Sequence, residues 1–150
     1  ALAGRGVAWR RKGELDRETL PAWLDPIYAE WLKFVSTPGF EMSHSDYMEY
    51  SETYGFAGPL DLAGVLPKIK GKPNAVIDIK RTLVGKTVSL QLAAYEHLLT
   101  ESTPFTGKYR RFGLQLNPSK FVEYTEARDW TDFLVALSFW RLKERLNSVK

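Results

Sequence analysis

The 150-residue sequence contains no cysteine, and this absence excludes several kinds of chemistry. Disulfide bonds, cysteine zinc sites, thiol catalysis and cysteine-ligated iron–sulfur clusters all require a side chain that is missing here. A chain without cysteine suits a reducing compartment, so we expect a cytoplasmic protein.

Long hydrophobic runs are missing too. No stretch approaches the length of a membrane span, and residues 1–16 lack the apolar core of a signal peptide, so we expect no membrane association. The composition, 44% hydrophobic and 26% charged, is that of an ordinary globular protein, and we predict a single domain over residues 1–150. The net charge of +3 is compatible with a polyanionic partner but does not require one.

Hydrophobic spacing predicts an α/β protein with a central mixed β-sheet flanked by helices. The predicted order is helices, three strands, a helix, two strands and a final helix. The segments in chain order are helices within residues 17–35, a hairpin over 45–66 with its turn at 51–55, a strand over 75–83, a helix over 87–101, a hairpin over 109–126 and a helix over 129–146. Four tryptophans at helical spacing are expected in the core: Trp23, Trp31, Trp130 and Trp140.

Two charged residues interrupt the apolar strand "AVIDIKRT" at residues 75–82. Asp78 and Lys80 are two positions apart, so their side chains project from the same face of a strand. Asp61 interrupts another apolar run 17 residues earlier, in "GPLDLAG". If the two segments pair, the two carboxylates converge, and their burial is costly without compensation. A divalent cation is the simplest compensation, and oxygen ligands favour Mg²⁺ or Mn²⁺.

Three short motifs in order resemble the PD-(D/E)XK nuclease superfamily, and within it the RecB-type and phage-exonuclease branch. They are Gly58-Pro59-Leu60-Asp61, Asp78-Ile79-Lys80 and Gln91-Leu92-Ala93-Ala94-Tyr95. The resemblance covers residues 41–99. It implies a restriction-endonuclease-like core, DNA as substrate and hydrolysis of phosphodiester bonds with Mg²⁺ or Mn²⁺.

The resemblance also implies a role for each matching residue. Asp61, Asp78 and the main-chain carbonyl of Ile79 would hold the metal ion. Lys80 would orient or deprotonate the attacking water and offset charge in the transition state. Gln91 and Tyr95, four residues apart on one helix face, would contact DNA or steady the site.

Two parts of the family pattern are not met cleanly. An acidic residue usually precedes G-x-x-D, and Glu41, Asp46, Glu49 and Glu52 compete for that place. Spacing favours Asp46, whereas Glu41 is the choice if its region is helical. Trp9 stands where the branch carries a metal-binding histidine, which indicates either a histidine-free site or impaired activity.

The other polar residues are expected to have supporting roles. His44 and His97 are out of place for the missing ligand, so we expect them to be surface or core residues. Basic residues near the site elements in sequence are expected to contact phosphates without reading sequence: Arg81, Lys86, Arg110 and Arg111.

The predicted function is therefore that of a DNA exonuclease in phage-type replication or recombination, in the host cytoplasm if a phage encodes it. A replication or recombination protein is a candidate partner. One alternative is a structure-specific endonuclease or junction resolvase on the same core. The others are a catalytically impaired DNA- or protein-binding module and a domain whose acids are purely structural. Digestion polarity, strand preference and oligomeric state stay open.

Overall fold

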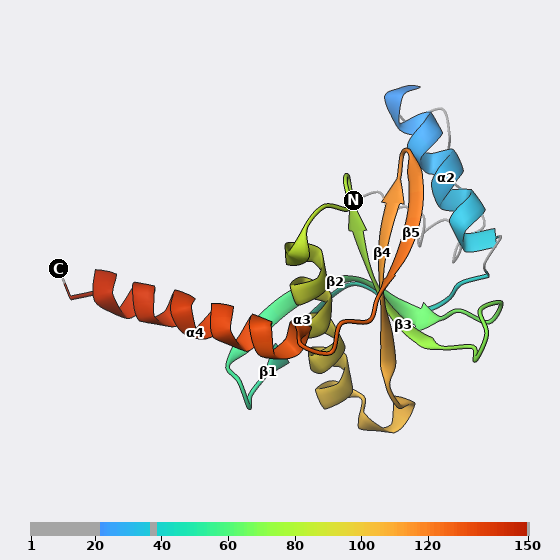
Figure 1. Ribbon diagram of the computed structural model, residues 1–150. Coiled ribbons are helices and arrows are strands. Elements are labelled where there is room, and N and C mark those ends of the chain that lie inside the picture. Colours follow the sequence, from blue (N-terminus) through green and yellow to red (C-terminus); the bar gives the residue numbers. More distant parts are fainter. Residues whose placement is uncertain (1–21, 37–38, 150) are drawn as a thin grey trace.

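The structure, a computed structural model, describes residues 22–36 and 39–149, apart from the side chain of Phe105. Trp9 and the beginning of the first predicted helix lie outside these residues. Figure 1 shows a twisted sheet with a helix against each face and a last helix extending away from it.

The sheet has five strands in the order β1-β2-β3-β4-β5. Their bounds are β1 Glu41–Ser51, β2 Phe56–Val65, β3 Asn74–Lys80, β4 Tyr109–Leu116 and β5 Ser119–Tyr124. The β3–β4 pair is parallel and the other three pairs are antiparallel. A parallel pair needs a crossover, which α3 (Lys86–Ser102) supplies. The predicted α/β fold with a central mixed sheet flanked by helices is confirmed.

Alternation along the strands builds a core on each side of the sheet. Ala75 and Ile77 face the helix α2 (Asp25–Ser36), where Trp31 is buried. Val76, on the opposite face of β3, packs with Leu92 of α3. Asp78 is two residues beyond Val76 and therefore also faces α3.

Each of the two helices that cover the sheet begins at a residue suited to a helix start. A short 3₁₀ turn, η2 (Ala22–Leu24), leads into α2, and Pro26 occupies the first turn of α2, where its missing N–H costs nothing. Gly85, at φ 75°, turns the chain into α3. The second 3₁₀ turn, η3 (Pro104–Thr106), connects α3 to β4.

The aromatic contacts of the last helix, α4 (Asp129–Asn147), come from its first turns. Trp130 stacks on His97 of α3 with ring centroids 4.0 Å apart, and Phe133 lies against Phe56. The prediction that Trp23 and Trp140 lie in the core is wrong, because both are exposed. Trp140 belongs to the C-terminal half of α4, and Figure 1 shows that this half extends past the edge of the body. No helix in the described part of the chain is both long and apolar enough to cross a membrane.

Candidate functional site

The predicted acid pair lies at a fork in the sheet. Strands β2 and β3 pair from Val65 opposite Asn74 up to Leu62 opposite Ile77, and the pairing stops there. Asp61 and Asp78 are the next residues on the two strands. Beyond the last backbone pair, the Asp61 side chain supplies the hydrogen-bond acceptor, because its Oδ2 accepts a hydrogen bond of 2.7 Å from the Ile79 N–H.

The alternation of side chains along β2 is interrupted, and Asp61 therefore faces α3. Leu60 and Ala63 both pack in the core beneath α3, although strict alternation would put them on opposite faces. Asp61 follows Leu60 and lies next to Asp78, whose pKa it raises. The sequence pattern around Asp61 therefore departs from regular alternation at the position where the site needs a second carboxylate.

Asp78 is a buried carboxylate with an incomplete set of partners. Its side chain is 2% exposed, and its Oδ2 lies 3.0 Å from the Lys80 ammonium. Apart from this ion pair, Oδ2 has no hydrogen-bond donor among the described residues. Burial raises the pKa of Asp78 to about 6, Lys80 lowers it and the charge of Asp61 raises it. The site thus holds more negative charge than the single ammonium can compensate.

Lys80 reaches solvent from the same strand. Its side chain is 33% exposed, so the ammonium has water on one side and Asp78 on the other. Gln115 lies opposite Lys80 on β4 and holds the segment that follows Lys80. The Gln115 amide accepts a hydrogen bond of 2.9 Å from the Leu83 N–H and donates one of 2.9 Å to the Pro118 carbonyl.

The helix α3 adds the predicted pair Gln91 and Tyr95. Gln91 Nε2 donates to the Tyr95 hydroxyl oxygen at 2.5 Å. Burial raises the pKa of Tyr95, Gln91 opposes this, and the charges of Asp78 and Asp61 raise it further. The phenol therefore keeps its proton at neutral pH and can donate a hydrogen bond.

The glycine of the first motif is required by the Tyr95 ring. A Cβ atom at Gly58 would lie 2.7 Å from Tyr95 Cε1, which is far inside van der Waals contact. Only a residue without a side chain lets α3 approach β2 this closely. Gly58 thus determines how near the Tyr95 hydroxyl comes to the acids.

Tyr124 of β5 belongs to the site and is absent from the sequence-based set. Its pKa is raised by burial and then by the charge of Asp78. The ring lies over Gly113, the residue opposite Asp78 on β4, where a Cβ atom would be 2.9 Å from Tyr124 Cε2. The alternation of β5 could have put Tyr124 on the α3 face, but only the register of β4 and β5 puts it beside Asp78.

The structure does not bring a third acid into the pair. Glu41 begins a strand rather than lying in a helix, and it pairs with Val65, four positions beyond Asp61. Asp46 lies opposite Asp61 in the register, but its φ of 46° interrupts the extended backbone, and its side chain is exposed. No group of three or more Asp, Glu, His or Cys side chains in the described part of the chain is arranged to hold a metal.

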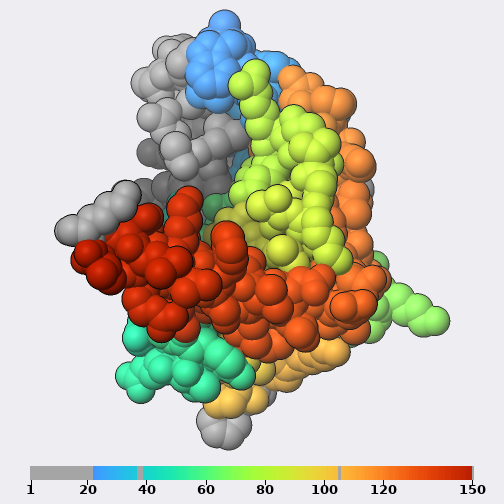
Figure 2. Space-filling view, turned by 60° about the vertical axis from the view of Figure 1, so that its left-hand side comes forward, coloured from blue at the N-terminus to red at the C-terminus, as the bar shows by residue number. Residues whose placement is uncertain are grey.

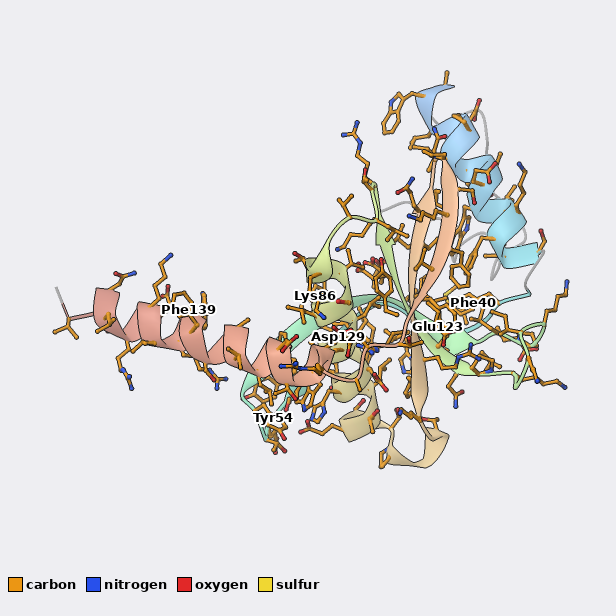
Figure 3. The ribbon with its side chains drawn as sticks, in the orientation of Figure 1. Phe40, Tyr54, Lys86, Glu123, Asp129 and Phe139 are labelled. Atoms are coloured by element: carbon orange, nitrogen blue, oxygen red, sulfur yellow. The ribbon has the colours of Figure 1, made fainter. Side chains whose placement is uncertain are left out.

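Three of the four basic residues expected to contact DNA have carboxylate partners. Arg111 is buried between Glu96 at 3.2 Å and Asp129 at 3.0 Å. Lys86 is 3.0 Å from Asp129, and Figure 3 shows these two side chains meeting where α3 and α4 begin. Arg110 makes two hydrogen bonds, of 2.6 and 2.7 Å, to Glu123.

Arg81, next to Lys80 in the chain, is exposed and is the member of the set without an ion pair in the described part of the chain. Both residues line a hollow of about 190 Å³ together with Asn117. Of the two histidines, His97 packs against Trp130, and His44 is half-buried on β1 beside Ser43. Their surface and core positions are as expected.

A larger groove adjoins the site on the α3 side. It has a volume of about 480 Å³, and Gln91 and Tyr95 form its boundary with the acid pair. The rest of its wall is mainly apolar and includes Phe56, Pro59 and Phe133.

No protein-family model matches the chain, and no curated protein matches it.

Proposed function

We propose that the protein is a Mg²⁺- or Mn²⁺-dependent deoxyribonuclease that digests DNA from its ends. One observation carries the proposal: Asp61 and Asp78 converge where β2 and β3 stop pairing, with the Lys80 ammonium 3.0 Å from Asp78. Such a group is expensive to bury for structure alone, because removing the charges from water costs several kcal/mol per ion. Its chemistry matches what the sequence motifs imply.

The donor set fits a hard divalent cation. Asp78 Oδ2 is buried and accepts no hydrogen bond from the described residues, which leaves it available as a ligand. Asp61 and the main-chain carbonyl of Ile79 would complete the protein ligands, and Mg²⁺ commonly takes one or two carboxylates and keeps several waters. When bound, the ion supplies Lewis-acid polarisation of the phosphate and a water of lowered pKa.

The chain's own side chains would carry the remaining steps. The Lys80 ammonium, with one side toward water, is positioned to hold the attacking water and to offset negative charge on the phosphoryl oxygens in the transition state. The protonated Tyr95 hydroxyl can donate to a phosphate oxygen, and Gln91 fixes its orientation. Arg81 is available for a phosphate contact because it is exposed.

Digestion of end-labelled linear DNA and closed circular DNA in Mg²⁺, Mn²⁺ or EDTA tests the proposal. We expect metal-dependent loss of the linear DNA only, reduced at least 100-fold in Asp78→Asn and Lys80→Gln. Asp132→Asn and Lys70→Gln are matched controls away from the fork and should retain wild-type rates. Nicking of the circle would replace the exonuclease with the endonuclease or resolvase alternative. A folded wild type that cuts neither DNA in any metal would overturn the proposal.

A binding-only module is the second candidate, and the Asp78–Lys80 ion pair favours it, because that pair already neutralises part of the buried charge. Calorimetric titration with Mn²⁺ separates the two candidates. The nuclease requires binding that Asp78→Asn abolishes, whereas a binding-only module that keeps the acids as a structural ion pair with Lys80 gives no heat of binding in either protein.

A further inference from the structure

The helix α4 has two apolar faces, and only one of them has a partner in the described structure. Trp130 and Phe133 lie on the inner face, against α3 and the turn between β1 and β2. Arg141 fastens the same face further along, because its guanidinium donates to the carbonyl oxygens of Tyr54 and Gly55. Figure 2 shows that turn directly beside α4.

The second apolar stripe lies on the opposite side of the helix. Its four members on the helix are between 41% and 69% exposed: Val135, Phe139, Leu142 and Leu146. Val149, which is 82% exposed, follows just after the helix ends. At about 3.6 residues per turn, these positions face away from Leu137 and Arg141 of the inner face. Figure 3 shows Phe139 on the part of α4 that projects from the body.

The spacing of the outer stripe is that of a coiled-coil seam. Successive members are separated by four, three and four residues, which is the alternating spacing of apolar d and a positions in a heptad, and Val149 continues it three residues beyond Leu146. A narrow seam of this kind matches a second helix packed lengthwise. It is narrower than the broad apolar face that buries a helix in a membrane surface.

The residues that flank the seam identify the charge of the partner. In the heptad defined by Phe139 and Leu146 at position a, the flanking e and g positions include Lys143 and Arg145 and no acid. Neither Lys143 nor Arg145 has an ion pair within residues 22–36 and 39–149. The flanking acid that would let two copies of α4 attract each other is missing, so self-pairing sets basic side chains against basic side chains.

We propose that the outer face of α4 is a docking surface for an acidic amphipathic helix of a partner protein. The partner helix would supply apolar a and d residues to cover Phe139, Leu142 and Leu146. Glu or Asp at its e and g positions would pair with Lys143 and Arg145. The surface is independent of the Asp61–Asp78 site, and so is its test.

Two fluorescent 28-residue peptides of four heptads test the proposal with the intact protein. Both have leucine at a and d; one has Glu at every e and g position and the other has Lys. We expect the acidic peptide to bind at least tenfold more tightly than the basic one in fluorescence anisotropy at 0.15 M salt. Phe139→Asp should weaken binding of the acidic peptide at least tenfold. The double variant Lys143→Glu and Arg145→Glu should reverse the preference.

The control variant is Glu144→Gln, which changes a charge on the opposite side of α4 and should leave both affinities unchanged. Far-UV circular dichroism of each variant establishes that α4 is retained. Equal binding of the two peptides, or binding of neither, overturns the proposal. Self-association that Phe139→Asp abolishes would make the occupant a second copy of the chain. Binding to anionic lipid vesicles but to neither peptide would make it a membrane surface.

Discussion

Asp78 is the residue whose environment is most at odds with stability. Its pKa lies near 6 in the folded protein against 3.8 for an ordinary aspartate, chiefly because of burial. Above pH 6 the carboxylate is ionised in both the folded and unfolded states, and its burial then destabilises the folded state. Below about pH 4 it is protonated in both states, and the cost disappears. The ionised site therefore lowers the free energy of unfolding at neutral pH.

We predict that Asp78→Asn stabilises the protein at pH 7.5 in EDTA, because asparagine resembles the protonated acid. The gain should be up to about 3 kcal/mol and should vanish as the pH falls from 6 to 4. Urea unfolding at a series of pH values measures it. Glu123→Gln is the matched control of opposite sign, since its Arg110 partner lowers the pKa of Glu123. A destabilised Asp78→Asn at pH 7.5 would contradict this account.

Gly58 sets a second constraint at the residue scale. We predict that Gly58→Ala destabilises the protein by about 1–3 kcal/mol, because the new Cβ would overlap the Tyr95 ring. Removing the ring with Tyr95→Ala should make the same glycine substitution nearly neutral. A double-mutant cycle in urea measures this coupling directly. Equal costs of Gly58→Ala in both backgrounds would show that the contact with Tyr95 is not the cause.

At the scale of elements, a buried ion network joins the beginning of α4 to β4 and α3. Arg111 contacts Asp129, which is fully buried, and Lys86 contacts the same carboxylate. We predict that Arg111→Met costs about 3–5 kcal/mol of stability, because it leaves Asp129 without its buried partner. Thermal unfolding in EDTA measures the loss.

Arg81→Gln is the comparison that separates structure from DNA contact. Arg81 is exposed, so its replacement should leave the unfolding temperature unchanged. It should weaken DNA binding and reduce the slope of log affinity against log salt by about one. An Arg111→Met protein of wild-type stability with weakened DNA binding would reverse these assignments.

The sequence predicts the elements well because their signals are local. The turn at residues 51–55, the strand that contains Asp78 and the helix that contains Gln91 and Tyr95 each follow from spacing and turn residues. The partner of a face is not a local property. The spacing of apolar residues in α4 does not indicate that Trp140 is exposed. The helix has two apolar stripes, and the spacing alone does not tell which of them packs against the rest of the protein.

The same limit applies to the candidate site. The spacing of Asp61, Asp78 and Lys80 is visible in the sequence, and the structure brings them together at the fork. Tyr124 is 46 residues from Asp78 in sequence and reaches it only through the β4–β5 register. Arg110 and Arg111 look alike as neighbours in the sequence. Alternation on β4 nevertheless sends them to opposite faces, one to Glu123 and the other into the core.

At the scale of the whole molecule, the site lies where the antiparallel strands β2 and β3 separate. Metal binding at Asp61 and Asp78 would tie β2 to β3 beyond the end of their ladder, so ligand binding and folding are linked. We predict that Mn²⁺ at 100 times its Kd raises the free energy of unfolding by about 2.7 kcal/mol. Thermal unfolding in Mn²⁺ against EDTA measures it. Asp61→Asn and Asp78→Asn should lose the shift, and an unshifted wild type would contradict the proposed site.

The same titration decides between the two candidate upstream acids. Asp46 lies opposite Asp61, so a small change at its left-handed backbone could bring its carboxylate to the fork, whereas Glu41 lies four positions along the strand. We therefore predict that Asp46→Asn weakens Mn²⁺ binding about tenfold and that Glu41→Gln leaves it unchanged. Calorimetry on the two variants measures both affinities. If the effects were reversed, β1 would have to shift against β2 by four residues on metal binding, which the buried Ser51 and its hydrogen bond to Glu101 oppose.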